Sequence, residues 1–261
     1  MSLLATEAIV LHAADYLESS RILRLATREA GVQSVIARGA RRPRNRFGSA
    51  LDLFAGGVAH IYVKAGRELN TLSSFEVSEG RPALGRDLGR FTAAALLAEL
   101  ALRFVRDDSN PALYDAVVAG FDRMAQAEPG ATREVALAAS WQLVRELGFA
   151  PSLDQCSLCH AEMDAAAEVH FSHRAGGAVC QRCAPAANRS KRAHPAAGRA
   201  LPAPARARLR GWLAGEPSIR LSDVESRAHA RLLREFLDEH LADGRPLRAF
   251  DVWATGGWET R

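Results

Sequence analysis

All four cysteines of the chain lie in one short stretch, QCSLCHAEMDAAAEVHFSHRAGGAVCQRC, which covers residues 155–183. They form two CxxC pairs, Cys156 with Cys159 and Cys180 with Cys183, and twenty residues separate the pairs. Each pair can chelate a metal ion through two thiolates, and two pairs together make a closed tetrahedral site of four sulfurs. The spacing is at the upper edge of the zinc-ribbon range. It predicts one structural Zn²⁺ per chain.

Other chemistry for these cysteines fits less well. The N-terminus has no basic leader and no small-residue cleavage site, which predicts a mature, cytoplasmic protein. Disulfides are rare in that compartment. A thioredoxin-like centre uses a single CxxC beside a βαβ unit, and we expect neither feature here. Iron binding and redox-active thiols remain open alternatives.

A catalytic zinc site is the sharper alternative. His160, Ala161 and Glu162 followed by a CxxC imitate the H-x-E and P-C-x-x-C pattern of zinc deaminases. However, Val179 precedes Cys180 where that pattern has proline, and four thiolates leave no position for a catalytic water. We expect the spare histidines of this segment, His160, His170 and His173, on the surface of a small hairpin. The chain also lacks a phosphate loop, a dinucleotide fingerprint and a nucleophile elbow, so we predict that it is not an enzyme.

The net charge of +4 is distributed unevenly. Residues 38–46 contain five arginines and no acid: Arg38, Arg41, Arg42, Arg44 and Arg46. A second zone, Val169 to Gly215, has no Asp or Glu and contains Arg174, Arg182, Arg189, Lys191, Arg192, Arg199, Arg206, Arg208 and Arg210. Segregated basic charge is typical of a surface that binds a polyanion, and a solvated surface in an arginine-rich chain is the alternative. Two such zones together favour binding.

The elements that would position these residues change along the chain. Short runs rich in Val, Ile and Leu, separated by glycines, predict strands near residues 7–12, 20–27, 32–38, 58–64 and 71–77. Strands at this spacing indicate a small barrel or sandwich, with the first arginine cluster on a loop between strands. Within that barrel, Tyr62 and Phe47 are either platforms on which bases stack or part of the core.

Beyond residue 87 the hydrophobic period becomes helical. Helices are expected at residues 88–104, 111–124, 132–147, 205–213 and 222–243. Their end signals are Asn110 before Pro111, Gly148, and the capping box of Ser222 and Glu225. The cysteine segment should form two strands joined at a Gly-Gly turn, and the Pro/Ala-rich stretch 188–204 should be irregular. The fold class is therefore α+β.

Three stretches carry a resemblance to a known family. EAIVLHAADYLESSRILRLATREAGVQSVIARGARRPRNRFGSALDLF resembles the opening of the RecO family of bacterial recombination mediators. WQLVRELGFAPSLDQCSLCH and FSHRAGGAVCQRC resemble the helix end and zinc module of the same family. Three positions depart from the pattern: Leu17 and His160 stand where glycine is common, and Arg38 stands where lysine is usual. The first two departures concern local turns, and the third keeps the charge.

The resemblance implies an N-terminal OB-fold β-barrel, a helical domain behind it and an inserted zinc module. We place the barrel at residues 1–80, the helical domain at 81–150 and 191–261, and the zinc module at 151–190. The implied function is DNA repair: binding of single- and double-stranded DNA without sequence preference, annealing, and help in loading recombinase onto coated strands. The implied partners are RecR and the acidic C-terminal tail of single-stranded-DNA-binding protein, in the cytoplasm at the nucleoid.

These expectations assign the candidate DNA contacts to two groups. The first is the arginine cluster at residues 38–46, and the second is Arg189, Lys191 and Arg192 in the later basic zone. Phosphate contacts by such residues would be independent of sequence. Two other classes remain open: a sequence-specific transcription regulator that uses the zinc module, and a protein-interaction scaffold whose arginines face acidic partners.

Overall fold

The computed structural model describes residues 2–45, 47–48, 50–64, 66–105, 109–128, 130–184, 198–216, 220–241 and 245–256. These residues belong to two compact units, one within residues 1–132 and 251–261 and the other within residues 133–250. The first unit contains a barrel and helices, and the second contains helices and a small sheet. The predicted α+β class is confirmed.

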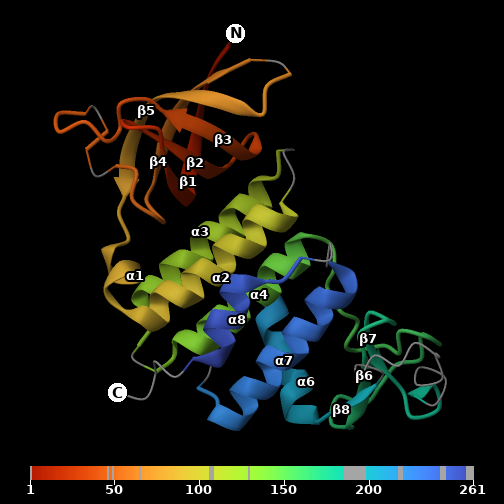
Figure 1. The fold of residues 1–261 in the computed structure, drawn as a ribbon. Coiled ribbons are helices and arrows are strands. Elements are labelled where there is room, and N and C mark those ends of the chain that lie inside the picture. The colour runs from red at the N-terminus through yellow and green to blue at the C-terminus, as the bar shows by residue number, and fades with distance from the viewer. Residues whose placement is uncertain are drawn as a thin grey trace. The chain divides into compact units, whose positions relative to one another are not determined.

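The first unit begins with a closed five-stranded barrel, red to orange in Figure 1. Its strands are β1 (Ser2–Tyr16), β2 (Ser20–Thr27), β3 (Gly31–Ala37), β4 (Gly56–Val63) and β5 (Leu69–Glu79). The order around the barrel is β1-β2-β3-β5-β4, with β3 and β5 parallel and the other neighbours antiparallel. This arrangement is an OB-fold, so the predicted barrel is confirmed and the sandwich is excluded.

Strand β1 is much longer than its apolar run predicts, because it closes the barrel. Its first half pairs with β4, and its second half pairs with β2. An irregularity between Val10 and His12 lets one strand bend to serve both neighbours. Alternate side chains fill the interior, and the innermost include Val10, Leu23, Leu25, Val35, Ile61 and Leu72.

Three helices follow the barrel in the first unit: α1 (Pro82–Arg86), α2 (Leu88–Phe104) and α3 (Pro111–Gln126). The sequence predicted the last two, including the cap of α3, where the Asn110 side chain accepts a hydrogen bond from the N–H of Leu113. Phe54, just before β4, packs against Phe91 of α2 and Phe121 of α3 at centroid distances of 6.0 and 5.0 Å. The barrel and these helices therefore share apolar contacts.

The second unit is built on α4 (Thr132–Glu146), α6 (Ala203–Ala214) and α7 (Asp223–His240). Trp141 of α4 packs against Phe236 of α7, and Trp212 of α6 packs edge-on against His229 of α7. The predicted capping box at the start of α7 is present. A further helix, α8 (Arg248–Thr255), begins in this unit, has residues 251–255 in the first unit, and was not predicted. None of the helices in the described ranges is long and apolar enough to cross a membrane.

The second unit also contains a three-stranded sheet of order β7-β6-β8. Strands β6 (Val169–Ser172) and β7 (Gly177–Val179) form the hairpin predicted around the Gly-Gly turn. Strand β8 (Arg199–Leu201) pairs with β6 inside the stretch that we expected to be irregular, so that prediction is wrong there. Pairing with β6 supplies the backbone hydrogen bonds that local sequence could not reveal. The candidate contacts Arg189, Lys191 and Arg192 lie outside the described residues.

Candidate functional site

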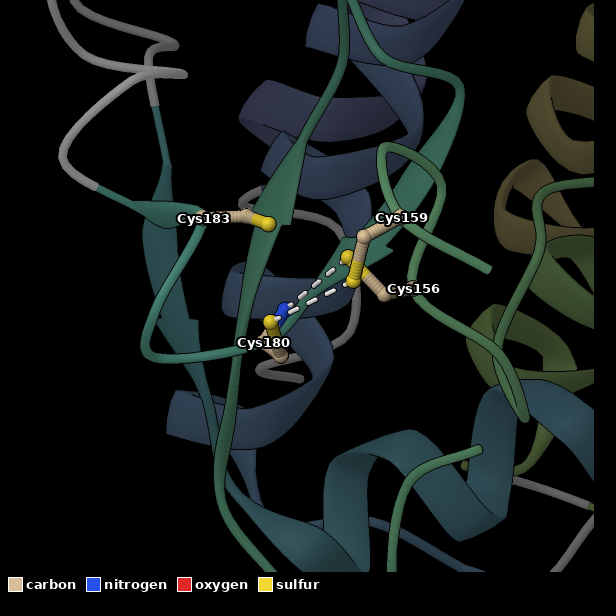
Figure 2. Close-up of side chains that lie close together, drawn as sticks. All are labelled: Cys156, Cys159, Cys180 and Cys183. Carbon is tan, nitrogen blue, oxygen red and sulfur yellow. Dashed lines mark hydrogen bonds between the residues drawn. The ribbon is translucent and has the colours of Figure 1, made fainter. Parts of the chain in front are cut away.

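The four cysteines come together at one end of the β6–β7 hairpin (Figure 2). Their sulfurs all lie within 4.8 Å of one another, and the sulfurs of Cys159 and Cys180 are 3.9 Å apart. A tetrahedral zinc site with Zn–S bonds of about 2.3 Å requires sulfur–sulfur distances of about 3.8 Å. The geometry is therefore that of a closed site of four sulfurs.

The first CxxC pair is held in place by backbone hydrogen bonds. The N–H of Cys156 donates to the carbonyl of Ala161, and the N–H of His160 donates to the carbonyl of Cys156, so the chain turns tightly around the sulfurs. The segment before this turn lies against β7, where a Cβ on Gly177 would be only 2.2 Å from the carbonyl oxygen of Ser152. Gly177 has φ +153° and leaves room for this close approach. The turn residue His160 also has left-handed backbone, with φ 58°.

The electrostatics of the cluster favour a bound cation. Burial opposes ionisation of Cys156, but N–H donors of Cys180, Cys159 and Leu158 outweigh it and lower its pKa to about 6. The N–H of Ala161 and the guanidinium of Arg182 lower the pKa of Cys159. In contrast, the sulfurs of Cys180 and Cys159 raise the pKa of Cys183 to about 12. Four thiolates cannot coexist here without a compensating positive charge, which Zn²⁺ would supply.

The histidines do not join this cluster. In the described part of the chain, the cluster able to hold a metal consists of the four cysteines alone. His160 and Glu162 are exposed, and His170 is half-buried. His173 is fully buried, and its Nε2 lies 3.1 Å from a carboxylate oxygen of Glu235, so its predicted surface position is wrong. The arrangement has no deaminase-like ligand set, because no histidine contributes a ligand.

The arginine loop, residues 38–46, lies between β3 and β4 as predicted. Arg38, Arg41, Arg42 and Arg44 are exposed on it, and Arg46 lies outside the described residues. The loop is shaped by its own backbone: the N–H of Arg42 donates to the carbonyl of Gly39, whose φ is 74°. The side-chain oxygen of Asn45 accepts hydrogen bonds from the N–H groups of Phe47 and Gly48. These turns point the arginines outward.

The exposed arginines of the loop differ in their contacts. Nε of Arg41 lies 3.3 Å from one carboxylate oxygen of Asp15, and Nε of Arg21 lies 3.3 Å from the other. Across the described ranges, Arg38, Arg42 and Arg44 have no acidic partner. The loop therefore presents three guanidinium groups without an acidic partner. The fourth, that of Arg41, is already paired with the carboxylate of Asp15.

Much of the second basic zone serves the fold. Arg206 is only 2% exposed, and its guanidinium donates to the carbonyls of Leu153, Asp164 and Met163. Arg199 pairs with Glu235 at 2.7 Å, and Arg210 pairs with Asp154 at 3.1 Å. These carboxylates lie outside the acid-free stretch, so the sequence of that stretch could not reveal them.

The two candidate stacking residues, Phe47 and Tyr62, differ in their exposure to solvent. Phe47 is 4% exposed and belongs to the barrel core. Tyr62 is 40% exposed on the outer side of β4. Of these two rings, Tyr62 is the one that is exposed to solvent.

Comparisons with known proteins agree along most of the chain. Residues 1–81 match the family described as recombination protein O N terminal, and residues 85–249 match recombination protein O C terminal. The DNA repair protein RecO of Anaeromyxobacter sp. strain K is 38% identical over 243 residues, which is 92% of each chain. RecO of Myxococcus xanthus is 31% identical over 96% of this chain and 97% of its own, and RecO of Bacillus cereus strain AH187 is 32% identical over 67% and 68%.

Proposed function

Because this chain belongs to the RecO family of DNA repair proteins, we propose that it is a recombination mediator that binds single- and double-stranded DNA without sequence preference. It anneals complementary strands and assists the loading of recombinase onto coated single strands. The observation that carries this proposal is the exposed arginine loop on an OB-fold barrel, since barrels of this kind bind nucleic acid through their loops and strand faces.

In the proposed mechanism, guanidinium groups of the arginine loop contact backbone phosphates. Each contact releases condensed counterions and carries no sequence information, which suits a general repair factor. Bound strands repel each other less, and their base edges stay free to pair. Annealing follows without a covalent step. Arg46, Arg189, Lys191 and Arg192 are proposed to extend the DNA path or to receive acidic partners.

Zinc has a structural role in this proposal. Cys156, Cys159, Cys180 and Cys183 would hold one Zn²⁺, which organises the segment around the β6–β7 hairpin.

The proposed domains are the barrel at residues 1–80, the helical domain at 81–150 and 191–261, and the zinc module at 151–190. The proposed partners are RecR and the acidic C-terminal tail of single-stranded-DNA-binding protein, and the proposed location is the cytoplasm at the nucleoid.

The arginine loop is tested by replacing Arg41, Arg42 and Arg44 with alanine. Affinity for single-stranded DNA should fall and annealing should slow. The log–log slope of affinity against salt should become shallower by about two, because each phosphate contact contributes about 0.7. Fluorescence anisotropy with oligonucleotides of several sequences measures both quantities, and the loss should be similar for all of them.

A matched control removes the same charge elsewhere. Arg220, Arg227 and Arg231, exposed in or just before α7, are replaced by alanine, and the salt slope should stay close to that of the unchanged protein. An unchanged slope in the folded loop variant would contradict the proposal. A strong preference among DNA sequences would favour the transcription regulator, and negligible affinity at physiological salt would favour the scaffold.

The absence of catalysis is tested separately. Glu162→Ala should leave DNA binding and annealing intact, because Glu162 is exposed and lies outside the sulfur cluster. Deamination of nucleobases that this substitution abolishes would overturn the non-enzymatic assignment.

A further inference from the structure

One arginine of the second basic zone contacts the sulfur cluster. Arg182 lies between Cys180 and Cys183, inside the second CxxC pair, and its side chain is exposed. Its Nη2 donates a hydrogen bond to the sulfur of Cys159 in the first pair, at 3.8 Å. Within the described part of the chain, Arg182 has no carboxylate partner, unlike Arg199 and Arg210. Its guanidinium is therefore free to act on the sulfur.

Two hydrogen bonds cross from the second CxxC pair to the first, and they serve sulfurs in different surroundings. The backbone N–H of Cys180 donates to the sulfur of Cys156 at 3.4 Å (Figure 2). Cys156 is fully buried, whereas Cys159 is exposed. The buried sulfur thus receives its donor from the main chain. The cross-pair donor of the exposed sulfur is the Arg182 side chain, which a substitution can remove.

A hydrogen bond to a zinc-bound sulfur lowers the reactivity of that sulfur. A zinc ligand is already a thiolate, so a nearby cation cannot increase the fraction that is deprotonated. What the donor changes is the basicity of the thiolate, and nucleophilicity falls with basicity. The effect matters most at Cys159, because a dissolved oxidant reaches an exposed sulfur more easily than a buried one.

We propose that Arg182 protects the zinc site from oxidation by peroxides, through its hydrogen bond to the exposed ligand Cys159. This inference rests on the proposed zinc site. Arg182 is not itself a ligand; it acts through the sulfur that it contacts. The arginine therefore serves metal retention, and this role differs from the phosphate contacts that the basic charge of its zone suggests.

The reaction that Arg182 opposes has two steps. The thiolate of Cys159 attacks one oxygen of hydrogen peroxide, the O–O bond breaks, the sulfur becomes a sulfenic acid, and hydroxide leaves. The thiolate of Cys180, whose sulfur lies 3.9 Å from that of Cys159, then attacks the sulfenic sulfur. A disulfide forms and a second hydroxide leaves. The two sulfurs have passed two electrons to the peroxide, and two thiolates remain, too few for a closed site of four sulfurs.

The test follows zinc release from the zinc-loaded protein in excess hydrogen peroxide with a zinc-sensitive dye. A roughly tenfold change in thiolate basicity changes nucleophilicity about threefold, so Arg182→Gln should release zinc about threefold faster than the unchanged protein. Arg182→Lys should keep most of the protection, because an ammonium group can still donate. Gln181→Ala is the matched control, since it alters the neighbouring exposed residue of the same CxxC pair and should leave the rate unchanged.

Three further readouts separate protection from a merely structural role. Transfer of zinc to EDTA without peroxide should be equally fast in Arg182→Gln and the unchanged protein. Peptide mapping should place the additional oxidation of the variant at Cys159. Salt screens exposed charges, so high salt should speed peroxide-driven release from the unchanged protein and leave the rate of Arg182→Gln alone. The salt arm needs no variant for its first half, so it decides the matter even if Arg182→Gln does not fold.

Three outcomes would overturn the inference. Equal rates in peroxide would show that the hydrogen bond gives no protection. An equal acceleration in EDTA would make Arg182 a residue that only holds the two CxxC pairs together. Additional oxidation at Cys183 and not at Cys159 would place the effect on another sulfur. If the unchanged protein contains no zinc, the proposed zinc site fails together with this inference, whereas zinc at one per chain with equal peroxide rates removes the inference alone.

Discussion

At the scale of single residues, Leu17 and His160 adopt backbone conformations that favour glycine. Leu17 has φ 52° and His160 has φ 58°, at the two positions where the sequence departs from the glycine common in the RecO pattern. Both turns therefore keep the left-handed backbone conformation although each residue has a Cβ, which strains the backbone. A left-handed residue with a Cβ costs about 1–2 kcal/mol, and the greater freedom of unfolded glycine offsets part of that cost.

We therefore expect Leu17→Gly to raise the free energy of unfolding by up to about 1 kcal/mol. The side chain is 76% exposed, so its removal loses little packing. Urea denaturation measures the change. Leu17→Ala is the control, since it retains a Cβ and should give no gain. A Leu17→Gly protein less stable than Leu17→Ala would show that the leucine side chain makes contacts that outweigh the strain.

Asp15 should restrain the arginine loop, because its carboxylate pairs with Arg21 and Arg41. A phosphate must displace this carboxylate to reach Arg41. Asp15→Asn should therefore strengthen binding to single strands and steepen the salt slope by about 0.7 if one more phosphate is contacted. Anisotropy titrations at several salt concentrations test this. The gain should disappear when Arg41 is also replaced by alanine, and a gain that persists would exclude competition for Arg41.

At the scale of elements, the cysteine turns should depend on the metal. Replacing Cys156 and Cys159 with serine should abolish zinc binding and lower solubility and stability, because the segment loses its organising centre. Elemental analysis of freshly purified, reduced protein should give one zinc per unchanged chain. His160→Ala should retain that zinc, since His160 is not in the cluster. Absence of metal from the unchanged protein would contradict the zinc assignment.

Helix α7 contains a buried histidine that should make stability depend on pH. Burial and nearby Arg208 lower the pKa of His229 to about 4, below its unfolded value of about 6.5. The unfolded chain then binds more protons between these values, so stability is complete above pH 6.5 and falls as pH drops towards 4. His229→Gln should reduce the loss between pH 7.5 and 5 by about 2 kcal/mol. Urea denaturation at both pH values measures it, and exposed His12→Gln should leave the loss unchanged.

Local sequence predicted the elements that have strong local signals. The five barrel strands, α2, α3, α4 and α7 were found because their periodicity and caps are written in adjacent residues. The missed elements depend on distant partners or are short. Strand β8 is a strand only because it pairs with β6, whereas α1 has five residues and α8 has eight. Likewise, CxxC spacing indicated the cluster of four cysteines. Nothing near Arg206 in sequence indicates that it is buried among the carbonyls of residues 153–167.

At the scale of the whole molecule, the distribution of charge on the surface differs from the distribution of charge along the sequence. An acid-free stretch predicted a basic surface, but Asp154 and Glu235 approach it from other parts of the chain and pair with Arg210 and Arg199. The first cluster kept its exposure because turns within it point the side chains outward. Segregation of charge in sequence thus predicts a surface only where the chain does not fold acids back onto it.

Within the first unit, two arginines join the barrel to the helices. Arg28, at the end of β2, forms paired hydrogen bonds with Asp115 of α3 at 3.1 and 2.5 Å. Arg81, only 7% exposed, donates from Nε to Asp122 of α3 at 2.7 Å and from Nη1 to the carbonyl of Phe54 at 3.0 Å. Phe54 is itself left-handed, with φ 67°, at the end of the connection that carries the arginine loop. Arg81 therefore links α3 to the end of the connection that leads from the arginine loop into β4.

Arg81→Met should lower the free energy of unfolding by about 3 kcal/mol, because it leaves the Asp122 carboxylate and the Phe54 carbonyl without their buried partner. Hydrogen exchange followed by mass spectrometry should show faster exchange at residues 47–63 and 111–126. Residues 151–184 of the other unit should keep both their protection and their zinc. Arg86→Met, an exposed arginine five residues later, is the control and should change neither quantity. If exchange rises equally in the zinc module, the arginine supports the whole chain, and the division into two units does not describe how the molecule unfolds.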